Sequence, residues 1–178
     1  MLVRELRNPK TIFTRMCIGE AVLALLKETE LKRLKILSVV KKAGVSRMTF
    51  YKYYTTPRSA LKDYLQIVIA EYVEAIEKED GDVHPFLSYE HILFALNFFD
   101  RYRTFFVTLK KQGLYSILID SINEFVSIHM PITEELSVYK RYSYAGSLLN
   151  CFLMWEENGK QESAEDVAQA IYELYKAK

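Results

Sequence analysis

The residues with the clearest chemistry form a run of cations that no acid interrupts. Between Leu31 and Lys62 the chain has nine lysines and arginines and no aspartate or glutamate. Residues 1–62 carry 14 basic and 4 acidic side chains, whereas residues 63–178 carry 10 and 19, so the net charge of +1 hides a segregation of charge. Clustered cations suit phosphate oxygens, and we expect one nucleic-acid-binding end and one solvated, non-binding end.

The middle of this stretch, residues 43–54, reads AGVSRMTFYKYY. It predicts a short helix over Lys35–Ala43, a left-handed turn at Gly44 and a second short helix over Arg47–Tyr53 that Ser46 caps. A helix–turn–helix of this spacing places the first turn of its second helix toward base edges in the major groove, while the first helix crosses behind. The alternative is that the basic helix pair is simply a solvated surface.

Side chains of the second short helix divide into two groups. Arg47 has the geometry to read guanine, and Met48 can touch a thymine methyl group. Tyr51 and its neighbours, Lys52 and Tyr53, can reach phosphates from the flank. The remaining aromatic residues, Phe50 and Tyr54, are four positions apart, and we expect them to pack inward.

Apolar residues recur every three to four positions along the rest of the chain, and there are few glycines and prolines, so we predict an all-α protein of about nine helices. The first helix begins near Asn8-Pro9, runs to about Glu28 and buries Ile12, Met16, Gly19, Leu23 and Leu26. A long fourth helix begins at Thr56-Pro57 and ends near Glu79, before a break at Gly81–Pro85. Further helices are predicted at 86–101, 103–111, 114–129, 133–157 and 164–176.

Catalytic and metal-binding patterns are missing from the sequence. His84, His91 and His129 lack metal-ligand spacing, and no nucleophile pairs with a base, so we expect no enzyme activity, no metal and no cofactor. Cys17 and Cys151 lie in apolar helical patterns typical of buried, reduced thiols. The segment MLVRELRNPK is not a signal peptide and no apolar run is long enough to span a membrane, so we expect a soluble, cytoplasmic protein.

The run AGVSRMTFYKYYTTPRSAL resembles the recognition-helix signature of the TetR family of transcriptional regulators, and the likeness covers about residues 8–68. The segment Trp155–Gly159, followed by Ser163 and a last amphipathic helix, is similar to the TetR branch that includes dihydroxyacetone-kinase regulators. This resemblance implies a helix–turn–helix head over residues 1–56, joined by a long fourth helix to a ligand-binding and dimerisation domain over residues 57–178.

Carried over to this sequence, the resemblance implies a set of DNA contacts on the second and third helices and at the start of the fourth. They are Lys35, Ser46, Arg47, Met48, Thr49, Tyr51, Lys52, Tyr53 and Arg58. Two positions depart from the family pattern: Met48 replaces a small residue, and Pro57 replaces a phosphate-binding lysine, so that contact is either lost or shifted to Arg58. Lys35 replaces a usual threonine.

The resemblance also implies a homodimer on a palindromic operator and a ligand site in the second half. For the ligand, aromatic and polar side chains form the candidate pocket, although the same residues can be plain core: Tyr89, Phe98, Tyr102, Phe106, Tyr115, Phe125, His129 and Tyr142. For the dimer, the candidate interface lies on the last two helices: Tyr144, Leu148, Phe152, Trp155, Ala168, Ile171 and Tyr175.

Three functions follow. The first is a dimeric regulator of double-stranded DNA, a repressor relieved by a small apolar or aromatic ligand. The second is a TetR-like co-activator that binds a protein partner. The third is a small-molecule carrier that does not bind DNA.

Overall fold

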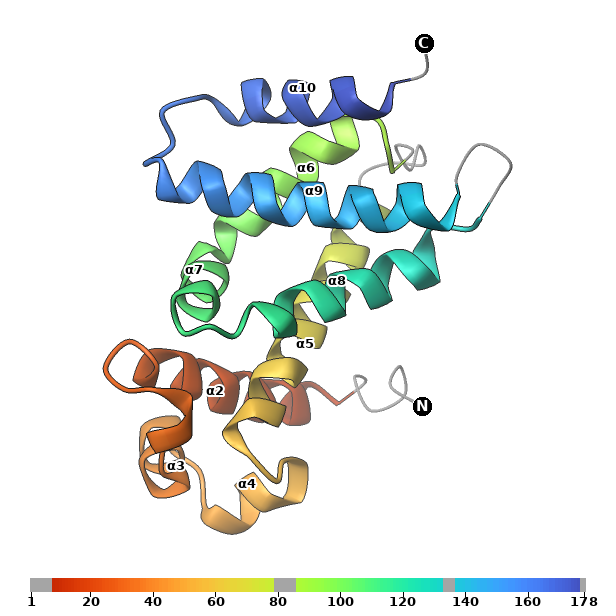
Figure 1. Cartoon of the computed structure of the whole chain (residues 1–178). Helices are drawn as coiled ribbons and strands as arrows, with labels where there is room; N and C mark the ends of the chain where they lie inside the picture. Colours follow the sequence, from red (N-terminus) through yellow and green to blue (C-terminus); the bar gives the residue numbers. More distant parts are fainter. Residues whose placement is uncertain (1–7, 79–85, 133–136, 177–178) are drawn as a thin grey trace. The chain divides into compact units, whose positions relative to one another are not determined.

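The computed structural model describes residues 8–78, 86–132 and 137–176 (Figure 1). Over these residues the chain is all-α, with no strand, as predicted. The helices are α2 (Pro9–Leu25), α3 (Ile36–Ala43), α4 (Arg47–Tyr53), α5 (Pro57–Lys78), α6 (Tyr89–Arg101), α7 (Arg103–Lys111), α8 (Tyr115–His129), α9 (Val138–Glu157) and α10 (Ala164–Tyr175), with a 3-10 turn, η1, at Leu31–Arg33. The predicted break at Gly81–Pro85, with His84, and the predicted start of a helix at residue 133 lie outside the described residues.

Capping residues set several of these boundaries. Asn8 Oδ1 accepts a hydrogen bond from the Lys10 amide at 3.1 Å, and Pro9 opens α2 as predicted. Ser137 caps α9 and Ser163 caps α10, each by accepting a bond from an amide three residues on. The predicted end of the first helix, Glu28, lies three residues beyond the observed end of α2 at Leu25. The difference arises because the chain turns at Leu26 and then forms η1.

The chain divides into two compact units, Met1–Glu71 and Tyr72–Lys178, and the division falls inside α5. We describe each unit by itself. The predicted boundary, at residues 56 and 57, lies at the start of that helix.

In the first unit, α2, α3, α4 and the first turns of α5 enclose a small apolar core. Its fully buried members are Ile18, Val22, Leu26, Val39, Phe50, Ala60 and Leu61. The buried face of α2 differs from the prediction: Ile12 and Met16 are only half-buried, while Arg15 is buried beside Ile18. Gly19 is required by close packing, because a Cβ atom there would lie 2.6 Å from Tyr64 Cβ on α5.

In the second unit, α6 packs against α9 and α10, and α8 packs against α9. Figure 1 shows α9 and α10 side by side. The aromatic core includes Tyr72, whose hydroxyl lies 3.0 Å from Nε2 of the buried His91. No helix within the described ranges combines the length and the low polarity needed to cross a membrane.

Candidate nucleic-acid interface

The turn between α3 and α4 is built by one glycine and one serine. Gly44 ends α3 with φ of 66°, the left-handed conformation that glycine adopts most easily, and the Val45 amide donates to the Val40 carbonyl at 3.0 Å. Two residues later Ser46 begins α4, with its Oγ accepting from the Thr49 amide at 2.9 Å. The sequence therefore folds locally as a short helix, a tight turn and a second short helix, as predicted.

Ser46 and Thr49 have a structural task in this turn. Their hydroxyls lie 2.8 Å apart, so each is a hydrogen-bond partner of the other. Both were predicted to contact DNA. In the structure Ser46 Oγ caps α4, and DNA contact by either hydroxyl stays a prediction.

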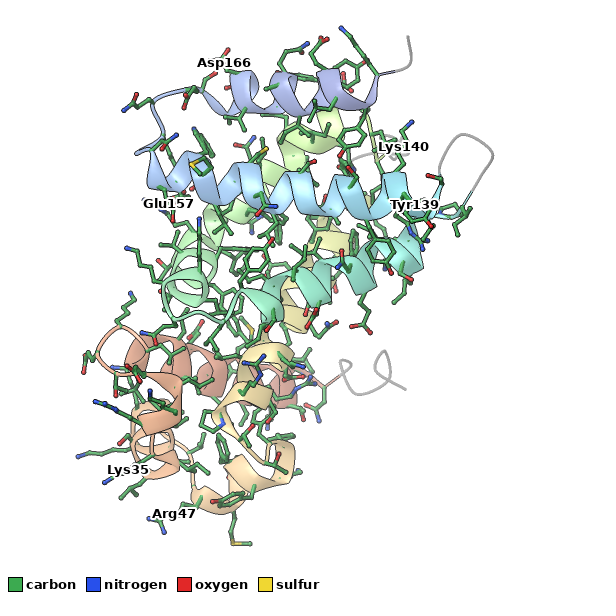
Figure 2. All side chains as sticks on the ribbon, in the orientation of Figure 1. Lys35, Arg47, Tyr139, Lys140, Glu157 and Asp166 are labelled. Atoms are coloured by element: carbon green, nitrogen blue, oxygen red, sulfur yellow. The ribbon has the colours of Figure 1, made fainter. Side chains whose placement is uncertain are left out.

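The outward face of α4 carries a cation and two exposed large side chains. Arg47 is exposed and projects from the start of the helix (Figure 2). Met48 is 85% exposed and Tyr51 is 58% exposed, although side chains of this size are usually packed. Lys52 is also exposed and its Nζ lies 5.2 Å from the centre of the Tyr53 ring, a cation–π distance.

The neighbouring predicted contacts lie on α3 and α5. Lys35 is the exposed N-cap residue of α3 (Figure 2), and Arg58 is half-buried in the first turn of α5. Leu37, in the first turn of α3, is 55% exposed and was not predicted as a surface residue of interest. Its neighbour Ile36 is more buried, a difference that a short apolar run does not reveal.

The inward side of α4 is held by aromatic packing and one polar network. Phe50 and Tyr54 are buried with ring centroids 5.8 Å apart, as predicted. The Tyr54 hydroxyl donates to Asp63 Oδ2 on α5. The same oxygen accepts from Arg15 Nε on α2 at 2.8 Å, and Arg15 Nη2 donates to the other carboxylate oxygen.

Asp63 is also the first acid after the acid-free stretch. This carboxylate is bonded to Arg15 and Tyr54. The sequence analysis missed the network. The available signal was an arginine on the apolar face of the first helix, which requires an acidic partner.

A polar hollow of about 430 Å³ lies beside this network within the first unit. It is lined by Asn8, Thr11, Arg15, Lys52, Tyr53, Tyr54 and Asp63. No group of three or more His, Cys, Asp or Glu residues suited to a metal ion occurs among the described residues.

The predicted pocket residues of the second unit do not form one group. Phe98 and Phe125 both pack against the Tyr72 ring, at 5.0 and 5.5 Å between centroids, and Tyr102 packs on Phe98. Phe106 is buried against Phe152.

The other four predicted pocket residues lie nearer the surface. Tyr89 pairs with Tyr172, and Tyr115 donates to Asn150 Oδ1 at 3.1 Å. His129 and Tyr142 are exposed. The pocket therefore remains a prediction.

The predicted dimer residues differ little in their burial. Tyr144, Leu148, Phe152, Trp155, Ala168 and Ile171 are all buried in the core of their own chain, and only Tyr175 is partly accessible. Neighbouring helices of the same unit cover most of these side chains. Trp155 and Ile171 also line the groove described next, so the predicted interface stays a prediction.

A groove with an apolar wall lies between α9 and α10. Its volume is about 520 Å³, and its wall includes Met154 and Leu174, which are 51% and 69% exposed. Cys151 also lines it, and burial raises the pKa of that thiol. The full lining is Asn150, Cys151, Met154, Trp155, Asn158, Glu162, Asp166, Val167, Ala170, Ile171 and Leu174.

The fold of this chain is similar to that of a solved structure. A crystal structure of a TetR transcriptional regulator from Streptococcus agalactiae 2603V aligns with a TM-score of 0.59 at 16% identity, covering 97% of this chain and 98% of that one. The chain has the TetR-type fold. The helix–turn–helix of a TetR-type fold corresponds here to α3, Gly44 and α4.

A relative in Bacillus subtilis (strain 168), named as the uncharacterized HTH-type transcriptional regulator YxbF, is 24% identical over 180 residues. The match covers 90% of this chain but 44% of that protein, so the chain spans less than half the length of the curated relative. No protein-family model matches the sequence. Both relatives carry the names of transcriptional regulators, and neither name is that of an enzyme.

The capping role of Ser46 predicts a local effect of its removal. In Ser46→Ala the Thr49 amide loses its acceptor, and α4 should lose about 1 kcal/mol of local stability. Hydrogen exchange of the α4 amides should accelerate about fivefold, while that of α2 amides stays unchanged. Ser38→Ala, in the exposed middle of α3, is the control. Unchanged exchange in α4 would contradict the capping role.

Proposed function

We propose that this protein is a homodimeric, DNA-binding transcriptional regulator of the TetR type. The observation that carries the proposal is the outward face of α4: Arg47, Met48 and Tyr51 are exposed on the second helix of a helix–turn–helix within the acid-free stretch. A solvated surface of no function explains the cations but not Met48, whose exposed apolar side chain suits a thymine methyl group in the major groove.

The exposed groups divide by the kind of contact they can make. Arg47 can donate two bonds to one guanine, and Met48 lies beside it for contact with a base edge. Tyr51, Lys52 and Lys35 are placed for phosphates, which fix the position of the head on the duplex. Tyr53 and Arg58 are half-buried and supply flanking contacts of the same class.

The groove between α9 and α10 is the proposed dimer surface. Exposed apolar side chains at Met154 and Leu174 line a concave surface, which a second copy can fill by an isologous contact. A two-fold dimer presents two heads to half-sites about 34 Å apart, so the proposed operator is a palindrome.

The regulatory half of the proposal is repression relieved by a small apolar or aromatic ligand in the second unit, which residues 57–178 would supply as the ligand-binding and dimerisation domain. A ligand that changes the distance between the two heads would move one head out of the DNA major groove, and the protein would then release the DNA. The likeness of Trp155–Gly159 to the dihydroxyacetone-kinase regulator branch favours the alternative, a co-activator with a protein partner. A small-molecule carrier remains the third candidate, and DNA binding in the test that follows would exclude it.

DNA binding is tested by fluorescence anisotropy with duplex DNA from the region upstream of the gene. The protein should bind with an affinity that falls steeply with salt, by roughly one unit of logarithmic slope per phosphate contact. Arg47→Ala should weaken binding about tenfold, because a bidentate base contact contributes about 1–3 kcal/mol. The pair Tyr51→Phe with Lys52→Ala should lower the salt slope by about one unit.

Lys111→Ala is the matched control, because it removes an exposed lysine at the end of α7, outside the head. It should bind like the wild type. Absence of saturable, salt-sensitive binding would overturn the proposed function. Binding that Arg47→Ala leaves unchanged would exclude α4 as the reading helix.

The dimer surface is tested by light scattering coupled to size-exclusion chromatography. Leu174→Glu places a charge in the apolar groove and should convert the dimer into a monomer. The measured mass should then fall from about twice 20.9 kDa to that of one chain. Tyr139→Glu is the control, since Tyr139 is 84% exposed and does not line the groove (Figure 2). A Leu174→Glu protein that stays dimeric would place the interface elsewhere.

A further inference from the structure

The recognition helix α4 has little apolar packing to fix its direction. Of its seven residues only Phe50 is buried, and its nearest helical neighbour is α3. Beside its carboxyl end lies the polar hollow of about 430 Å³, so close packing does not hold that side of the helix. Another constraint must set the angle at which α4 leaves the head.

The Tyr54 hydroxyl supplies such a constraint. Tyr54 is the C-cap residue of α4, and its hydroxyl donates to Asp63 Oδ2. Arg15 donates hydrogen bonds to both oxygens of the same carboxylate, with Nε at 2.8 Å from Oδ2. Through one carboxylate, the end of α4 is tied to α5 and to α2.

The junction of Arg15, Tyr54 and Asp63 has a fixed geometry, and its tyrosine and arginine keep their protons. A guanidinium that donates to both carboxylate oxygens fixes the plane of the carboxylate, and the phenol then has one preferred approach. Burial, together with the bond to Asp63, raises the pKa of Tyr54 far above its ordinary value, so the hydroxyl keeps its proton at any working pH. The hydrogen bond to Asp63 likewise raises the pKa of Arg15, which stays charged.

Stability alone is a poor explanation for the network. Replacing a buried ion pair by apolar side chains of similar size is often neutral or stabilising, because the charges no longer have to be desolvated. An orientation that only polar groups can specify is a better explanation for a charged junction beside a seven-residue helix.

We propose that Tyr54 is a positioning residue that, through Asp63 and Arg15, holds α4 at the angle required for the major groove. The inference rests on the proposed DNA binding. Tyr54 itself does not contact DNA: it acts on Arg47 and Met48 by orienting the helix that carries them.

The test is Tyr54→Phe in the full chain, which removes the hydroxyl and keeps the packed ring. DNA affinity, measured by anisotropy at fixed salt, should fall about fivefold, the loss expected from one hydrogen bond of ordinary net strength. The melting temperature should stay within a few degrees of the wild type. Tyr64→Phe is the control, because it removes a buried hydroxyl from α5 of the same unit, and its affinity should be unchanged.

Amide hydrogen exchange separates positioning from general stabilisation. In Tyr54→Phe, exchange should accelerate at Phe50 and Tyr54 while the amides of α2 and of the first turns of α5 keep their protection. Equal acceleration in all three helices would show a merely structural role and overturn the inference.

A triple variant gives a second, independent test. Arg15→Met with Tyr54→Phe and Asp63→Leu replaces the junction by apolar side chains and should melt at or above the wild-type temperature while binding DNA at least about fivefold more weakly. Recovery of both stability and affinity would overturn the inference. If the wild type binds no DNA, the proposed function fails. If it binds and Tyr54→Phe binds equally well, the positioning role alone fails.

Discussion

The partly buried ion pair between Arg15 and Asp63 is the interaction on which the first unit depends. These two residues lie 48 positions apart and join the first helix of the unit to the last. The carboxylate has one further partner of its own, the hydroxyl at the end of α4. A short helix with one buried side chain gains a fixed attachment in this way, and removal of the Asp63 carboxylate would leave the buried Arg15 guanidinium without its acidic partner.

The same pair accounts for the electrostatic character of the surface. The acid-free stretch ends at Lys62, and the next residue is an acid. Because Asp63 turns inward, the cations of α3 and α4 keep an outer face that no carboxylate of that stretch neutralises. The first unit therefore carries the whole acid-free stretch, and most of the acids of the chain lie in the second unit.

Local signals made the helices of the head predictable. Asn8-Pro9, Gly44, Ser46 and Thr56-Pro57 act within four residues of themselves, and α3 and α4 formed within a residue of the predicted bounds. The inward direction of Arg15 was not predictable, because its partner is distant in sequence. Ser46 and Thr49 were predicted as DNA contacts, and the hydrogen bond between their hydroxyls was not predicted.

The second unit shows a different limit. Apolar periodicity shows that one face of α9 packs against another helix. It does not show whether that helix belongs to the same chain or to a second chain. Phe152, predicted for the dimer interface, is fully buried within its own unit, while Leu174, at the edge of the same pattern, is exposed. Aromatic side chains likewise signalled a core without telling whether it encloses a ligand, because packing and binding use the same residues.

The most direct test of the central claim, that α4 is the DNA-reading helix, is an amide chemical-shift titration of the isotope-labelled protein with upstream duplex DNA. The account predicts that the largest shifts fall on residues 46–53 and at Lys35, and that the amides of α8 in the second unit move little. Shifts confined to the second unit, or no shifts at a duplex concentration that saturates anisotropy, would contradict it.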